Sequence, residues 1–246
     1  MNTDNTALQT ESEAADCNSM TIADDLARKI SGLDAVDAAA FLESLEPSAA
    51  VRVLRTMSPD TADQIMANLK SDKQNSLLAE LPPQIREQWK INKSFPQGSI
   101  GRLMEPPAAV FAPDMPVAEA IEVLRGLVKK EFITYAYVID VHRKLIGVIV
   151  MRELLFADKS MLLRDIMLKD PFSLKAEVDL MDAMKQVLTK HFPVYPVTDS
   201  QGELIGQVRG YRLFEAQAVE ISAQAGSMVG VEKEEKLSTS WSRSFK

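Results

Sequence analysis

The most restrictive feature of this 246-residue sequence is that its C-terminal half contains the same unit twice. The run Val138-Ile139-Asp140, followed by Leu145-Ile146-Gly147-Val148, returns 59 residues later as Val197-Thr198-Asp199 and Leu204-Ile205-Gly206-Gln207. Two copies of an α/β unit can bury their sheets against each other, so the pair should fold as one object. A tandem of this kind favours a role in sensing over a role in catalysis.

Each copy predicts a short strand, a helix, a hairpin of two strands and a closing helix. In the first copy we expect these elements at Val110–Phe111, Val117–Val128, Tyr135–Asp140, Leu145–Val150 and Arg152–Phe156. In the second we expect them at Phe172–Leu174, Leu180–Thr189, Val194–Thr198, Leu204–Val208 and from Leu213 onward. The turn Asp199-Ser200-Gln201-Gly202 is a strong hairpin signal.

The region from Leu42 to Trp89 repeats every 12 residues. Apolar residues share one phase at Leu42, Leu54, Met66 and Leu78, and prolines share another at Pro47, Pro59 and Pro83. Proline is tolerated in the first helical turn, so Ser58-Pro59-Asp60 predicts an N-cap, a first residue and an acidic first turn. Each unit predicts a helix of about nine residues that is too short to be stable alone. Stacked units would form a helical solenoid.

Composition excludes several classes of protein. The net charge of -7, from 28 basic and 35 acidic side chains, argues against nucleic acid as a partner. Cys17 is the one cysteine and there are two histidines, so thiolate and histidine metal sites are not expected. No apolar run approaches the roughly 18 residues of a membrane span. The polar start, Met1 to Met20, lacks the features of a signal peptide, which predicts a cytoplasmic chain.

The duplicated part, from Gly98 to Ala218, resembles a pair of CBS domains. Hairpins of the form D-x-x-G-x-L-x-G-x-[VI], here Asp199 to Val208, carry this resemblance. The helical repeat, the junction Phe95-Pro96-Gln97-Gly98-Ser99-Ile100-Gly101-Arg102-Leu103-Met104 and the CBS pair together resemble the cytosolic region of MgtE-type magnesium transporters, without the transmembrane domain.

The expected fold class is α + α/β, with an N-terminal all-helical solenoid, a tandem CBS pair of βαββα repeats and a C-terminal connecting helix. The predicted limits are 1–20 for a disordered N-terminus, 21–95 for the helical domain, 96–158 and 159–214 for the CBS domains, and 215–246 for the connecting helix and membrane-proximal tail.

The resemblance implies a cytosolic regulator that senses magnesium and gates transport. It also implies a homodimer formed through the CBS domains, a transmembrane transport domain as the partner, and a location at the inner face of the cell membrane. In such a regulator, Mg²⁺ screens facing carboxylates that otherwise repel each other. The metal candidates are Asp60, Asp63, Asp72, Glu215 and Glu220.

Two positions depart from the pattern of the resembled family, because Arg212 and His191 stand where acidic residues are usual. A cation at Arg212 repels Mg²⁺. CBS modules that hold adenine nucleotides use a [ST]-x-x-D element, whose positions fall on Val150 to Glu153 and on Arg209 to Arg212. The candidates for a nucleotide or phosphate are Arg152, Glu153, Arg209 and Arg212.

The alternative function is a stand-alone CBS adaptor that binds an adenine nucleotide or a protein partner. An enzyme is not expected, because the sequence has no nucleophile–base set, no phosphate-binding glycine loop and no H-E-x-x-H element.

Overall fold

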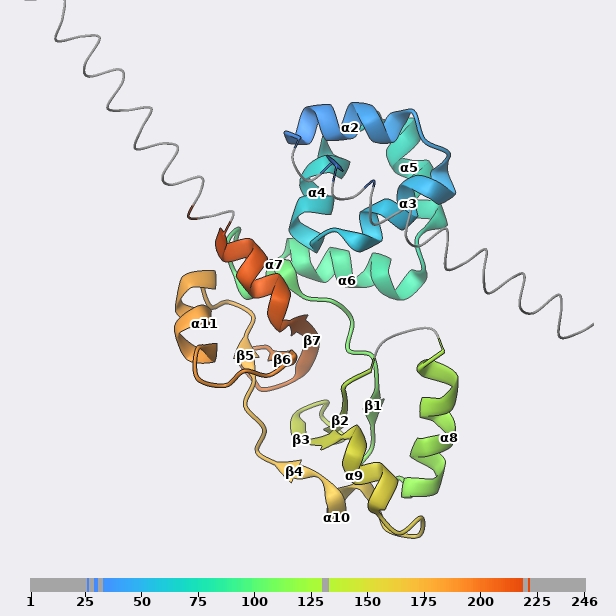
Figure 1. Ribbon diagram of the computed structural model, residues 1–246, viewed down its shortest axis with the longest axis vertical. Helices are drawn as coiled ribbons and strands as arrows, with labels where there is room; N and C mark the ends of the chain where they lie inside the picture. Colours follow the sequence, from blue (N-terminus) through green and yellow to red (C-terminus); the bar gives the residue numbers. More distant parts are fainter. Residues whose placement is uncertain (1–25, 27–28, 31–32, 130–132, 219–220, 222–246) are drawn as a thin grey trace, which may run out of the picture. The chain divides into compact units, whose positions relative to one another are not determined.

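The computed structural model describes residues 26, 29–30, 33–129, 133–218 and 221. The chain forms two compact units. The first, here called the helical unit, runs to Gln97 and includes Gly101–Pro106, and the second, the CBS unit, comprises Gly98–Ile100 and the chain from Pro107 (Figure 1). The predicted N-terminal segment 1–20 and the tail beyond residue 221 lie outside the described residues.

The helical unit consists of short helices separated by tight turns. They are α2 (Ala35–Glu43), α3 (Pro47–Thr56), α4 (Pro59–Ala67), α5 (Ser71–Glu80), α6 (Pro83–Lys93) and the single turn α7 (Ile100–Leu103), whose first residue belongs to the CBS unit. Proline begins α3, α4 and α6, and the Ser58 side chain accepts a hydrogen bond from the Thr61 amide. The sequence prediction for these helix starts is therefore confirmed.

The helices of this unit pack mainly against their second neighbours, because α2 contacts α4, α3 contacts α5 and α4 contacts α6. Polar ties follow the same spacing of about two repeats. Lys70 Nζ lies 2.9 Å from Glu43 Oε2, and the Lys73 ammonium donates to the Leu45 carbonyl. The apolar residues of the repeats form one continuous core, in which Leu42, Leu54 and Leu77 are fully buried, whereas Leu78 is partly buried.

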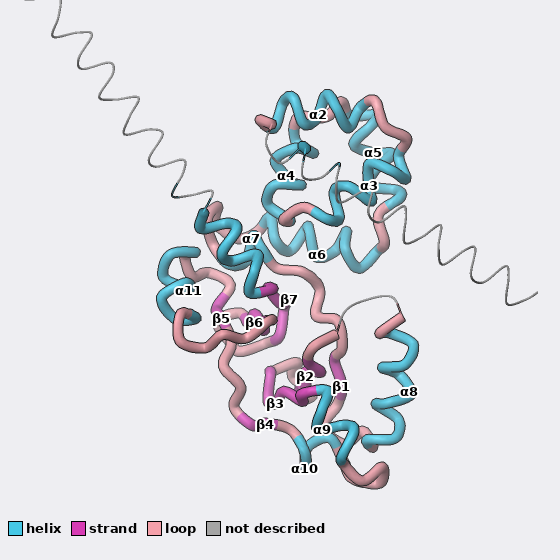
Figure 2. Tube along the Cα trace, in the orientation of Figure 1, coloured by secondary structure: helices cyan, strands magenta, loops and turns pink. Residues whose placement is uncertain are grey.

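The CBS unit contains the two predicted copies, each built around a small sheet. The first has β1 (Val110–Phe111), α8 (Val117–Leu127), β2 (Tyr135–Ile139), β3 (Leu145–Val150), α9 (Met151–Phe156), α10 (Leu163–Ile166) and β4 (Leu168–Lys169). The second has β5 (Leu174–Lys175), α11 (Leu180–Val187), β6 (Val194–Thr198) and β7 (Leu204–Arg209). The sheet orders are β1-β2-β3-β4 and β5-β6-β7, with the first pair of each parallel and the hairpins antiparallel (Figure 2).

The observed elements differ from the prediction by more than one or two residues at the ends of helices and strands. The strand expected at Phe172–Leu174 lies at Leu174–Lys175, and neither α10 nor β4 was expected. The closing helix of the second copy starts at residue 210 rather than at Leu213 and is continuous to 218. The predicted limit between the second CBS domain and the connecting helix, at 214/215, therefore falls inside a helix.

The two copies are joined through their hairpins. The Leu145 amide donates to the Gly202 carbonyl at 3.1 Å, and the Leu204 amide donates to the Arg143 carbonyl at 3.0 Å. Beside them, the hydroxyl of the fully buried Tyr137 donates to Gln207 Oε1 at 3.0 Å, and burial raises the pKa of this tyrosine. These bonds make the duplicated halves one structural object, as the repeat predicts.

The hairpin turns offer a matched pair of substitutions, because equivalent tips hold Arg143 at φ 61° and Gly202 at φ 90°. This left-handed region is unfavourable for residues with a Cβ. Arg143→Gly is expected to raise the free energy of unfolding by about 1 kcal/mol, and Gly202→Ala to lower it by about as much. Urea unfolding of both variants tests this, and a change of the same sign in both would contradict it.

Candidate functional site

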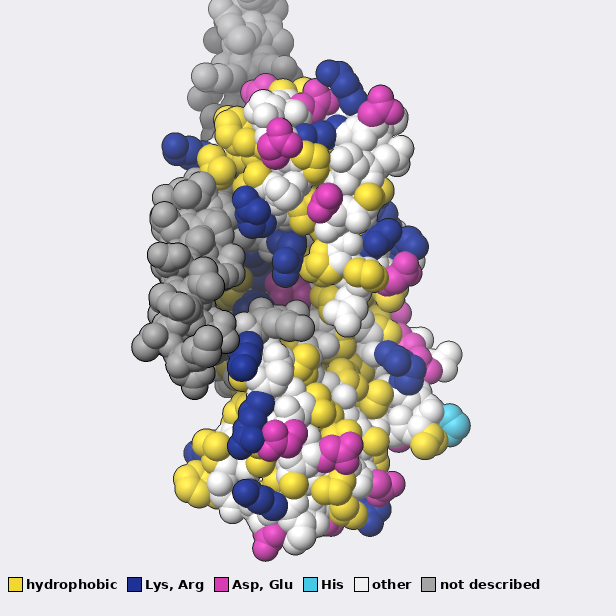
Figure 3. All heavy atoms as spheres, turned by 90° about the vertical axis from the view of Figure 1, so that its right-hand side faces the viewer, with side chains coloured by type: hydrophobic (Ala, Val, Ile, Leu, Met, Phe, Trp, Pro, Cys, Tyr) yellow, Lys and Arg dark blue, Asp and Glu magenta, His cyan; other side chains and the backbone are white. Residues whose placement is uncertain are grey.

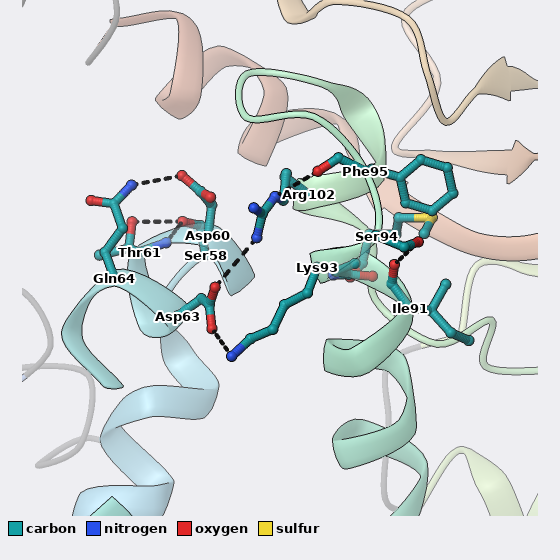
Figure 4. Close-up of polar contacts among 12 residues, drawn as sticks. Ser58, Asp60, Thr61, Asp63, Gln64, Ile91, Lys93, Ser94, Phe95 and Arg102 are labelled. Atoms are coloured by element: carbon teal, nitrogen blue, oxygen red, sulfur yellow. Dashed lines mark hydrogen bonds and ion pairs between the residues drawn. The ribbon is translucent and has the colours of Figure 1, made fainter. Parts of the chain in front are cut away.

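A cluster of charged side chains lies where α4, α6 and the turn α7 meet within the helical unit (Figure 4). It surrounds a cavity of about 10 Å³, close to the space that one water molecule needs. The residues that line this cavity are Pro59, Asp60, Asp63, Trp89, Asn92, Lys93 and Arg102. Two of the predicted metal candidates, Asp60 and Asp63, are therefore brought together.

Asp63 is the centre of the cluster. Its carboxylate lies between two cations, with Oδ1 2.7 Å from Lys93 Nζ and Oδ2 3.3 Å from Arg102 Nη1 (Figure 4). The side chains of Asp63 and Arg102 are only 25% and 16% exposed, so solvent screens this pair less than an open surface pair. The pair joins residues 39 positions apart in the sequence.

Asp60 is the second carboxylate of the cluster and lies in the first turn of α4. Burial raises its pKa, while a 2.8 Å hydrogen bond from Gln64 Nε2 and the nearby charge of Arg102 act in the opposite direction. Partial desolvation of an acid beside a second acid is the arrangement in which a bound cation relieves the most repulsion.

The chemistry of the cluster fits a hard divalent cation only in part. Carboxylate oxygens are suitable ligands for Mg²⁺, and Asp60 and Asp63 supply them. However, Lys93 and Arg102 already balance the two negative charges, and the cavity is too small for a hydrated ion. Mg²⁺ would have to displace the ammonium of Lys93, the more exposed of the two cations at 53%.

The remaining metal candidates lie elsewhere. Asp72 is exposed in the first turn of α5 and is not among the residues that line the cavity. Glu215 pairs with Arg212 at 3.0 Å in the helix after β7, and Glu220 lies outside the described residues. Across the part of the chain that the structure describes, no group of three or more His, Cys, Asp or Glu side chains could hold a metal ion.

Three of the nucleotide candidates, Arg152, Glu153 and Arg212, pair with neighbours on their own helices. Arg152 pairs with the adjacent Glu153 at 2.9 Å at the start of α9. In the second copy Arg209 ends β7, and the guanidinium of Arg212 lies 5.1 Å from the ring centre of Tyr211 as well as pairing with Glu215. The first copy thus retains one carboxylate suited to ribose hydroxyls, whereas the second offers arginines instead.

The segment Gly101–Pro106 is here called the exit segment. Neither Lys93 nor the contacts of this segment were expected from the sequence. Arg102 Nε donates to the Phe95 carbonyl at 3.0 Å, and Asn92 Nδ2 donates to the Met104 carbonyl at 2.8 Å. No signal in the sequence links Asp63 with Lys93, because the 12-residue period does not show that a helix contacts its second neighbour.

On the face shown in Figure 3, acidic and basic side chains are interspersed. This agrees with a modest net charge of -7 and gives no single-sign patch on that face. Of the helices that are described, none is long and apolar enough to cross a membrane.

Comparison with known families assigns most of the chain. The family model of the MgtE intracellular N domain matches residues 21–93, and the model of the CBS domain matches residues 100–160 and 163–218. The predicted domain limits remain predictions, although these matches follow the same order.

Relatives by sequence include two proteins named magnesium transporter MgtE. The one from Thermus thermophilus is 29% identical over 52% of this chain and 29% of its own length, and the one from Enterococcus faecalis is 30% identical over 43% and 23%. An inosine-5'-monophosphate dehydrogenase from Korarchaeum cryptofilum is 35% identical over 39% of this chain and 20% of its own length. The chain thus spans less than a third of each of these relatives.

Solved structures give the same assignment. The cytosolic domain of the Mg²⁺ channel MgtE in complex with ATP is 25% identical, with a TM-score of 0.65 over 77% of this chain and 78% of that one. The soluble part of a magnesium transporter is 24% identical and has a TM-score of 0.64 over 82% and 78%, which supports the fold. Both structures are of the cytosolic or soluble part of a magnesium channel or transporter.

Proposed function

Because the chain belongs with the cytosolic regions of MgtE-type magnesium transporters, joining an MgtE intracellular N domain to a CBS pair, we propose that it regulates magnesium transport by sensing Mg²⁺. The observation that carries this proposal is the order of the domains, since a helical N domain followed by a CBS pair matches the channel's cytosolic domain over 77% of this chain. A transmembrane transport domain is the proposed partner. The proposed location of the regulator is the inner face of the membrane.

Asp60 and Asp63 are the proposed magnesium-sensing residues in the helical unit. Mg²⁺ takes the place of Lys93 on the Asp63 carboxylate, and the partly desolvated Asp60 supplies a second oxygen ligand. Because the two cations already balance the two carboxylates, Mg²⁺ binds with low affinity, at millimolar concentrations of the ion. Asp72, Glu215 and Glu220 remain secondary candidates, of which Glu215 is held by Arg212.

A magnesium titration tests the sensing function. We expect Mg²⁺ to raise the melting temperature of the chain by several degrees more than K⁺ at matched ionic strength. A ligand at ten times its Kd adds about 1.4 kcal/mol to the stability of the state that binds it. Asp63→Asn should remove most of this difference, and calorimetric melting with parallel solution scattering measures it.

Asp37→Asn is the matched control. Asp37 is an exposed acid in the first turn of α2, and its substitution removes the same charge as Asp63→Asn. Equal shifts in Mg²⁺ and K⁺ for the unmodified chain would end the sensing proposal. A magnesium-specific shift that survives Asp63→Asn would instead move the site to the other candidates.

A second copy of this chain is the other proposed partner, bound through the CBS unit. The closing helices of the two copies expose equivalent apolar residues, with Leu155 79% exposed and Phe214 54% exposed, while their neighbours Leu154 and Leu213 are buried. Phe156 extends the first of these surfaces at 83% exposed. A two-fold contact between two chains at this surface is self-complementary, because Arg152 of one chain can face Glu153 of the other chain.

Phe156→Ser is expected to shift the chain from dimer to monomer at micromolar concentration, because it removes an exposed aromatic anchor from the proposed interface. Light scattering across a dilution series measures the change. Val141→Ser is the control, since Val141 is 93% exposed on a hairpin tip away from the closing helices. Loss of the dimer in both variants, or in neither, would exclude this interface.

The alternative is a CBS adaptor that binds an adenine nucleotide. It is favoured by the likeness to a structure that contains ATP and by the carboxylate of Glu153 at the start of α9. Calorimetric titration with ATP and AMP distinguishes the two functions. An adaptor should bind nucleotide even if Mg²⁺ does not raise the melting temperature of the chain, and Glu153→Gln should lose that binding.

A further inference from the structure

The exit segment, Gly101–Pro106, is folded as part of the helical unit although it follows that unit's last repeat. Leu103 is 7% exposed and Met104 is fully buried. By contrast, the preceding residues Gly98–Ile100 belong to the CBS unit, where the Ile100 amide donates to the Val178 carbonyl at 2.9 Å. The chain therefore crosses between the two units three times within about ten residues.

The polar contacts of the exit segment include a neutral set and a charged set. One set is neutral and buried, in which Gln88 Nε2 donates to Asn92 Oδ1 at 3.0 Å and Asn92 donates to the Met104 carbonyl. The other is charged and centres on Arg102, which reaches both the Asp63 carboxylate and the Phe95 carbonyl. The charged set connects the segment to α4, in the middle of the repeats.

The charged set can be lost without dismantling the repeats. Their core is built from apolar residues between Leu26 and Trp89, which precede the exit segment. If Arg102 leaves Asp63, Lys93 still neutralises that carboxylate at 2.7 Å, so no buried charge is left unpaired on α4. Local opening is therefore less costly here than at an ordinary buried ion pair.

We propose that the Asp63–Arg102 pair is an ionic latch, which keeps the exit segment folded on the helical unit and whose release detaches that segment while the repeats stay folded. Release leaves one chain crossing between the units in place of three. This inference goes beyond magnesium sensing and does not require it, because the latch is built from side chains of the chain itself.

Hydrogen exchange of the full chain, followed by mass spectrometry in chelator-treated buffer, tests the latch. Arg102→Gln and Asp63→Asn are expected to speed exchange in the exit segment by about tenfold or more and to leave exchange in α2 to α6 unchanged. Lys93→Gln keeps the Arg102 pair and removes the cation that neutralises Asp63 after release, so exchange in the exit segment should be no faster than in the unmodified chain. Lys90→Gln is the charge-matched control, because Lys90 pairs with Glu87 on the open surface.

Unchanged exchange in the exit segment of Arg102→Gln would overturn the latch. Faster exchange spread over all the helices would also overturn it, since the pair would then support the whole fold rather than one segment. Because the buffer is free of divalent ions, neither result depends on whether the chain senses magnesium, and failure of the latch is distinct from failure of the sensing proposal.

Discussion

Leu77→Ala is expected to lower the free energy of unfolding of the helical unit by about 3 kcal/mol. Leu77 is fully buried and is the buried residue that α5 contributes to the repeat core. Truncation removes apolar contacts and leaves a cavity, which costs about 2–5 kcal/mol at such sites. Urea unfolding followed by tryptophan fluorescence measures the loss, because Trp89 packs against that core. A Trp241→Phe background removes the signal of the second tryptophan.

Leu78→Ala is the matched control, since the adjacent leucine is only partly buried against the same core. It should cost less than half as much as Leu77→Ala, because less of its side chain is removed from water. Equal losses would mean that the burial of a leucine side chain does not decide how much it supports the unit.

Gly101→Ala is expected to destabilise the exit segment by about 2 kcal/mol or more. A Cβ on Gly101 would lie 2.7 Å from Phe95 Cβ and closer still to its ring, which is nearer than non-bonded carbons approach. Overpacking of this kind typically costs about 1–3 kcal/mol, because the ring must shift with its backbone. Hydrogen exchange at residues 101–106, together with thermal melting, measures the effect.

Gly126→Ala supplies the opposite expectation within the same chain. Gly126 lies in the exposed face of α8, and a Cβ there would meet nothing within 4 Å. Alanine is the better helix former, so this variant should gain about 0.5–1 kcal/mol. A stabilising Gly101→Ala would show that Phe95 does not pack on the turn α7 as described.

The fold was predictable where a single local signal decides it. Prolines at a fixed phase start α3, α4 and α6, and the turn at Asp199 closes its hairpin through bonds from the Gln201 and Glu203 amides to its own carboxylate. Such signals act over a few residues, so they do not depend on contacts with distant parts of the chain. The duplication then fixed the pairing of the two copies, since each sheet needs a partner.

The charged cluster was only half predictable. Asp60 and Asp63 stood out as acids on a polar face, but the 12-residue period does not show that a helix contacts its second neighbour rather than its first. The cations Lys93 and Arg102 therefore could not be placed beside them. Asp72 occupies a similar helical position one unit later, yet it is exposed and does not line the cavity.

The anchoring of the exit segment to α4 restricts how the repeat array can change length. Most solenoids gain or lose units by duplication or deletion at any point, because each unit contacts only its neighbours. Here a unit added between Asp63 and Lys93 would preserve every apolar phase and every proline, yet it would carry the exit segment away from its carboxylate. Growth of the array by whole units should therefore be confined to the side that precedes α4.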